Sequence, residues 1–148
     1  MSRIISFRGL IESGGQDTIP LQTNNGLIGY RITKFQLMGQ KPGAEPMEHV
    51  VKIYKTDQTG NINATIDFSD NRLLAAAYMQ DNIGEHYVSS IDVVFDNEKF
   101  NQDIYVTCFD VKSEVYPINY YFELEQMKLD LSEQTVATLK DIRNVGAE

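Results

Sequence analysis

The sequence predicts a mainly β protein, namely a jelly-roll-like antiparallel β-sandwich of about eight strands with a short C-terminal α-helix. Apolar residues recur at period two, or in short runs of β-branched and aromatic residues, over most of the chain. Turn-forming residues separate these runs about every eight to twelve residues, which is typical of sandwiches and barrels. A chain of 148 residues suits one domain, so we expect residues 1–148 to fold as a single β-sandwich unit.

The first two strands are expected near the N-terminus. The run "RIISFRGLIE" at residues 3–12 is rich in β-branched residues and ends at Gly14 and Gly15. A second run, "DTIPLQT" at 17–23, contains Pro20, which cannot donate a ladder hydrogen bond. The second strand is therefore expected at a sheet edge or as an irregular strand.

A hairpin is predicted next. Asn24, Asn25 and Gly26 lie between the second run and the apolar stretch "LIGYRITKFQLM" at 27–38. Asn and Gly tolerate the positive φ angles of a tight two-residue turn. We therefore expect 17–23 and 27–38 to pair with each other.

Within 27–38, the apolar residues switch from one face of the expected strand to the other. Ile28, Tyr30 and Ile32 share one face, whereas Phe35 and Leu37 fall on the other. Either this strand is covered on both sides or a bulge shifts its phase. After the loop "KPGAEP", the run "HVVKIYK" predicts another strand with apolar residues on both faces.

The middle of the chain leaves two alternatives open. Residues 73–79, with three consecutive alanines, favour a helix by propensity, while the surrounding β pattern favours a strand. Beyond them, "HYVSSIDVVF" and "DIYVTCF" flank the polar segment "DNEKFNQ". We expect these two runs to form a second hairpin, with Ile91, Val93 and Phe95 on one face of its first strand.

The last predicted strand alternates clearly. Ile118, Tyr120, Phe122 and Leu124 occupy one face, and polar residues occupy most of the other. After Glu125 the apolar positions change parity, so a bulge or a change of covering layer is expected there.

A helix over 132–145 is predicted to follow. Apolar residues recur every three positions, Ser132 suits the N-cap and Gly146 lies where a C-cap glycine would. A helix of this length is marginal alone in water, so its apolar stripe needs a partner. That partner is either the sheet of the same chain or a neighbouring chain, and the candidate interface residues are Leu131, Val136, Leu139 and Ile142.

The charge of the chain argues against two classes of partner. The net charge is −8, and residues 75–148 carry 14 acidic and 5 basic groups. This sign repels phosphate backbones, so we expect no nucleic-acid binding. No apolar run approaches the length of a membrane span. The single cysteine, Cys108, cannot form an internal disulfide and fits a small buried position.

Few residues show a pattern of chemical function. Glu123 and Glu125 stand two apart on one strand face, roughly 6.6 Å along the strand, but both point the same way instead of flanking a substrate. The segment 57–68 resembles a calcium loop, although Ile62 replaces the glycine and Phe68 the glutamate that such a loop needs. The isolated His49 and His86 lack metal-ligand spacing. We therefore expect no catalytic residue, no cofactor and no metal, and thus no enzyme.

Four segments resemble small virion proteins of marine bacteriophages: "SRIISFRG", "ATIDFSDNRLLAAAY", "VVFDNEKFNQDIYVTCFD" and "PINYYFELEQMKLDLSEQTVATLKDIRN". The resemblance implies a structural protein made in the host cytoplasm and located in the virion, such as a minor capsid, vertex or decoration protein. Its expected partners are other capsid proteins and further copies of itself. The alternative is a β-sandwich module that binds a carbohydrate or cell-surface ligand, with or without calcium, through Tyr116 or the polar loops.

Overall fold

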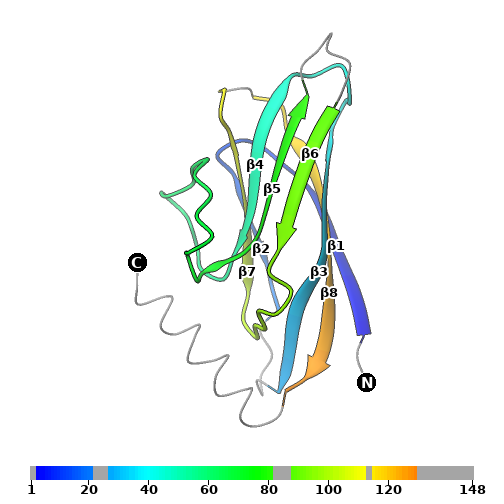
Figure 1. Ribbon diagram of the computed structural model, residues 1–148, viewed down its shortest axis with the longest axis vertical. Coiled ribbons are helices and arrows are strands. Elements are labelled where there is room, and N and C mark those ends of the chain that lie inside the picture. Colours follow the sequence, from blue (N-terminus) through cyan, green and yellow to red (C-terminus); the bar gives the residue numbers. More distant parts are fainter. Residues whose placement is uncertain (1–2, 22–26, 82–87, 113–114, 130–148) are drawn as a thin grey trace.

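The computed structural model contains eight β-strands (Figure 1) and describes residues 3–21, 27–81, 88–112 and 115–129. The predicted C-terminal helix at 132–145, with Leu131, Val136, Leu139 and Ile142, lies outside these residues. The strands are β1 (Arg3–Ile11), β2 (Gln16–Ile19), β3 (Ile28–Gly39), β4 (Met47–Tyr54), β5 (Leu73–Asp81), β6 (Val88–Val94), β7 (Ile104–Asp110) and β8 (Ile118–Lys128).

The strands form two antiparallel sheets. One has three strands in the order β1-β8-β3, and the other has five in the order β2-β7-β4-β5-β6. Every paired strand in both sheets is antiparallel. The prediction of a mainly β, antiparallel protein with about eight strands is confirmed for the described part of the chain.

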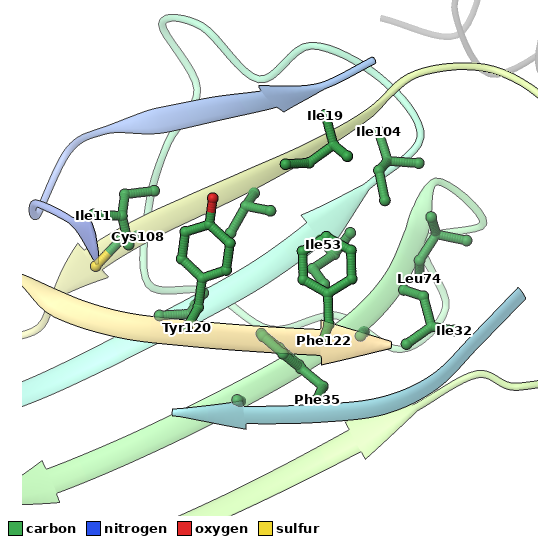
Figure 2. Packing of buried hydrophobic residues seen from close by; sticks show 14 of the residues in the cluster. Ile11, Ile19, Ile32, Phe35, Ile53, Leu74, Ile104, Cys108, Tyr120 and Phe122 are labelled. Atoms are coloured by element: carbon green, nitrogen blue, oxygen red, sulfur yellow. The ribbon is translucent and has the colours of Figure 1, made fainter. Parts of the chain in front are cut away.

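The hydrophobic core draws side chains from both sheets. Tyr120 and Phe122 of β8 are buried, as the alternation in this strand predicts, and their rings stack with centroids 6.0 Å apart. Figure 2 shows these rings beside Phe35 of β3, with Ile53 and Cys108 of the five-stranded sheet in the same cluster. Removing this large apolar area from water is the main force that holds the two sheets together.

A bulge in β3 explains the change of phase in its sequence. The pairing of β3 with β8 shifts register between Ile32 and Lys34, so one residue is added to β3. Ile32 and Phe35 consequently both point into the core, where each is 1% exposed. The bulge is thus in β3, and β8 keeps a continuous register from Ile118 to Lys128.

Residues 73–79 form a strand. They belong to β5, which is paired on both sides by β4 and β6. Ala75 and Ala77 lie in the same core cluster as Phe35 and Phe122, where small side chains leave volume for the large rings. The tertiary environment therefore overrides the helical propensity of the alanines.

Both predicted hairpins are wrong. The strand at 17–23 becomes β2 and pairs with β7, whereas the strand at 27–38 becomes β3 and pairs with β8 in the other sheet. Likewise β6 pairs with β5, while β7 pairs with β4 and β2. β2, β3 and β7 thus take partners far away along the chain, whereas β6 pairs with β5, the strand before it rather than the one after it. The predicted edge position of β2 is confirmed, and the strand ends directly before Pro20.

The connector 55–72 covers the outer side of β4 in the five-stranded sheet at Lys52. Lys52 points outward from β4, yet it is only 2% exposed. Its Nζ donates hydrogen bonds to the backbone oxygen of Thr65 at 2.5 Å and to Oδ1 of Asn63 at 3.3 Å. Every residue of β4 is buried, in agreement with the apolar residues predicted on both of its faces.

Candidate functional site

The outer side of the three-stranded sheet carries the exposed apolar residues Ile4, Leu10 and Met38 and is the candidate functional site. We call it the outer face. Strand registers place four rows of side chains across it, each with one residue from β1, β8 and β3. In order, the rows are Ile4-Glu125-Arg31, Ser6-Glu123-Lys34, Arg8-Tyr121-Gln36 and Leu10-Asn119-Met38.

The two carboxylates singled out in the sequence lie in the middle strand of this face. Glu125 accepts a hydrogen bond from Nε of Arg31 at 3.0 Å, and these two side chains are 24% and 32% exposed. Glu123 accepts one from the hydroxyl of Tyr121 at 2.5 Å, and this bond raises the pKa of Tyr121. Both acids are therefore engaged by neighbours on the sheet surface.

A groove of about 690 Å³ lies where one end of the three-stranded sheet meets β6, with Ala77 of β5 also in its lining. Arg8, Gln36, Asn119 and Tyr121 line it from the three-stranded sheet, and Asp92 lines it from β6. Arg8 makes no ion pair with any described residue. The groove thus combines a guanidinium group, two amides, a carboxylate and the two tyrosines Tyr120 and Tyr121 within a volume typical of ligand sites.

Exposed apolar residues lie beside the polar part of the groove. Met38 of β3 and Ile91 of β6 both line the groove and are 63% and 65% exposed. Leu10 stands in the same row as Met38 and is 47% exposed. A polar centre with an exposed apolar rim is a surface on which a partner can bury area while its polar groups find hydrogen bonds.

The strands bring His49 together with Asp110 in a second polar cluster. Nδ1 of His49 lies 2.6 Å from Oδ2 of Asp110, and both side chains are 0% exposed. Nε2 of His49 lies 2.5 Å from the backbone oxygen of Tyr116. Asp110 also accepts hydrogen bonds from the backbone amides of Glu48 and Lys112, at 2.9 and 2.7 Å. A substrate cannot reach this cluster, which joins β4 and β7 to the segment before β8.

The calcium-like segment at 57–68 forms a series of short side-chain turns. Asp57 accepts hydrogen bonds from the amide and hydroxyl of Thr59, and Asp67 does the same for Ser69. These bonds lower the pKa of both aspartates. The carboxylates organise their own backbone in this way. Within the described residues, no three His, Cys, Asp or Glu side chains are grouped as metal ligands would be.

The remaining residues named from the sequence are placed as follows. Cys108 is buried in the core, and burial raises the pKa of its thiol to about 12. The side chain of Tyr116 packs partly buried against that core, away from the groove. His86 lies outside the described residues. No helix in the described part of the chain is long and apolar enough to cross a membrane.

Sequence reasoning missed most of the groove. The polar face of β8 was visible in its alternation and included Asn119 and Tyr121. Arg8, Gln36 and Asp92, however, reach the groove only through cross-strand registers and the position of β6. Their positions 8, 36 and 92 carry no shared local pattern that could have grouped them.

In comparisons with known proteins, no family model matches the chain and no curated protein is similar to it.

Proposed function

We propose that this chain is a non-enzymatic structural protein of a phage virion, in the role of a minor capsid, vertex or decoration protein. It is made in the host cytoplasm, acts in the virion through protein–protein packing, and binds other capsid proteins and copies of itself. The resemblance of its sequence segments to marine phage proteins suggests this role.

The order of the strands supports the proposal through the fold. β1 pairs with β8, β2 with β7 and β4 with β5, and β3 contacts β6. This pattern arises when one long hairpin of eight strands folds over on itself, so we interpret the fold as a sandwich of the jelly-roll type. β6 departs from the ideal pattern because its hydrogen bonds go to β5. Jelly rolls recur in capsid proteins and also in lectins, so the fold alone does not choose between these functions.

The apolar rim of the groove is the observation that favours packing against a protein. Met38 and Ile91 line the groove from two sheets and are exposed, and the exposed Leu10 stands in the same row of the outer face as Met38. Single exposed apolar residues are ordinary, but several gathered around one groove are typical of interaction sites. The adjoining charged rows, which include Arg31 and Glu125, would give such an interface its orientation.

Mass spectrometry of purified phage particles tests this proposal. We expect the chain at a constant ratio to the major capsid protein across the fractions of a density gradient, including fractions washed with high salt. A chain that is produced during infection but is absent from the washed particles contradicts the proposal.

The groove supports a second candidate function, which is carbohydrate binding. Tyr121 offers an aromatic ring, and Arg8, Gln36 and Asn119 offer donors and acceptors of the kind that hydroxyl-rich ligands use. A saccharide at one hundred times its Kd would stabilise the protein by about 2.7 kcal/mol. A thermal-shift screen of saccharides tests this, with Asn119→Ala expected to abolish the shift and Ser6→Ala, outside the groove, expected to preserve it. No shift with any saccharide contradicts this second function.

A further inference from the structure

Strand β1 has the most open edge in the described structure. Of the four strands at sheet edges, β2 has four residues and ends directly before Pro20. The edges of β3 and β6 contact each other, and the bulge after Ile32 interrupts β3. β1 has nine residues, pairs with β8 without interruption and lies at the margin of the molecule in Figure 1.

The sequence of β1 contains few of the devices that block edge pairing. It has no proline, its register with β8 contains no bulge, and its only charged residues are Arg3 and Arg8. Ile4 and Leu10 are 54% and 47% exposed on its outer face. A long and regular edge with exposed apolar side chains is a template for pairing with another strand.

We propose that β1 pairs antiparallel with β1 of a second copy, around a two-fold axis at Phe7. Such an axis is perpendicular to the sheet, so residues directly opposite each other come from the same face. This condition holds only for registers in which one residue lies opposite its own copy at the axis. Among these, the registers centred on Ser6, Phe7 and Arg8 pair the most residues of the two β1 strands.

Charge and apolar matching select the register centred on Phe7. Here Ile4 of each copy lies opposite Leu10 of the other, and Arg8 lies opposite Ser6. Centring on Arg8 sets two guanidinium groups against each other, and centring on Ser6 sets Ile4 against Arg8. Like charges directly opposite destabilise a pair, whereas two apolar residues stabilise it. In the register centred on Phe7, the exposed apolar residues of one β1 strand therefore meet those of the other.

The pairing would join two three-stranded sheets into one continuous six-stranded sheet. Roughly eight to ten backbone hydrogen bonds would form, since each hydrogen-bonded residue pair in an antiparallel ladder exchanges two bonds. The two outer faces, each with its groove, would then form one surface related by the two-fold axis. This inference deepens the proposed function and rests on it only for the biological meaning of the dimer, because the pairing itself needs no other virion component.

Two double variants test the pairing and its register by sedimentation velocity over a wide range of protein concentration. Ile4→Lys/Leu10→Glu places opposite charges face to face across the two-fold axis, and Ile4→Lys/Leu10→Lys places like charges there. Both remove the same exposed apolar groups, and both set the new lysine of position 4 opposite Glu125 of β8. Circular dichroism and the melting temperature establish that both variants fold.

We expect the wild type and the opposite-charge variant to double in mass with rising concentration, and the like-charge variant to remain a monomer. A wild type that stays monomeric at several hundred micromolar overturns the proposal. Equal self-association of both variants also overturns it, because the contact would then lie elsewhere. Loss of self-association in both variants overturns it as well, because the register centred on Phe7 would then be rejected. A wild-type monomer that uses β1 to bind a different virion protein also overturns self-pairing. Because these measurements use the purified chain alone, their result is independent of whether phage particles contain the protein.

Discussion

The two sheets differ in how their outer sides are covered. On the five-stranded sheet, the connector 55–72 lies over β4, and Lys52 is buried beneath it with oxygen partners from the connector. On the three-stranded sheet, Ile4 and Met38 remain more than half exposed. The central strand β4 of one sheet is therefore covered by its own chain, and the other sheet keeps a face and an edge on which a partner can bind.

The side-chain contacts made by carboxylates in the two regions differ in the same way. His49 and Asp110 are fully buried between strands of the five-stranded sheet, whereas Arg31 and Glu125 are partly exposed on the outer face. A buried charge without its partner is costly, while exposed pairs contribute little. Mutations in the covered region should therefore change stability, and mutations on the outer face should change association.

The largest expected effect is that of His49→Ala. The variant leaves the Asp110 carboxylate buried without the imidazole that lies 2.6 Å from it. We expect a loss of about 3–5 kcal/mol in the free energy of unfolding, measured by urea titration at pH 7. A loss below about 1 kcal/mol would show that this cluster does not hold β4 and β7 together.

Alkaline pH should destabilise the protein through groups buried in and around the core. Burial raises the pKa of Cys108 from its ordinary 9.0 to about 12, and that of Tyr54 from 10.0 to about 12. Above pH 9 the unfolded chain starts to release these protons while the folded chain retains them. Each group that is fully ionised in the unfolded chain but still protonated in the folded chain then lowers the free energy of unfolding by about 1.4 kcal/mol per pH unit. Lys52 opposes this trend near pH 10, because burial lowers its pKa.

Urea titrations between pH 7 and 11 measure this decline. We expect stability to fall from about pH 9 upward, with Cys108→Ala flattening the first part of the fall because the thiol is the first of these groups to ionise in the unfolded chain. Stability that stays constant to pH 11 would contradict the burial of these groups.

A smaller effect is expected for Lys52→Met. The variant retains the apolar stem but removes the hydrogen bonds to Thr65 and Asn63 that fasten the connector. We expect a loss of about 1–2 kcal/mol together with faster protease cleavage within 55–72. The control is Lys34→Met on the outer face. Equal cleavage rates in the two variants would show that Lys52 does not hold the connector.

The smallest effect is expected for Arg31→Met. It removes the 3.0 Å contact with Glu125 and a 3.3 Å hydrogen bond to the backbone oxygen of Asp96, both at partly exposed or exposed positions. The loss of stability should lie between about 0 and 1 kcal/mol. A cost close to that of His49→Ala would remove the contrast between the two regions.

Local pattern predicted the strands better than their partners. The alternation in β8 placed Tyr120 and Phe122 in the core, and the change of phase in β3 predicted either a bulge or burial on both sides. The two predicted pairings failed because each joined a strand to the next one along the chain, whereas β2 and β3 belong to different sheets and β6 pairs with the strand before it, β5. The actual pairing of Ile28 with Lys128 joins residues a hundred positions apart, and no local turn encodes such a contact.

The candidate site shows the same limit. The carboxylates of β8 could be seen in the sequence, but their partners could not, since Arg31 and Glu125 are 94 residues apart. The groove needs β1, β3, β5, β6 and β8 to be placed together before its composition can be recognised. The predicted helical interface at Leu131, Val136, Leu139 and Ile142 stays a prediction, because it lies outside the described residues.

Amide hydrogen exchange of β1 at low and high protein concentration tests the central claim most directly. The claim is that the three-stranded sheet keeps an open edge that pairs with a second copy. At low concentration, we predict that the amides of β1 pointing away from β8 exchange quickly, and that high concentration protects them while leaving β2 unchanged. Exchange in β1 that is equally fast at both concentrations, or equally slow at both, would contradict the account.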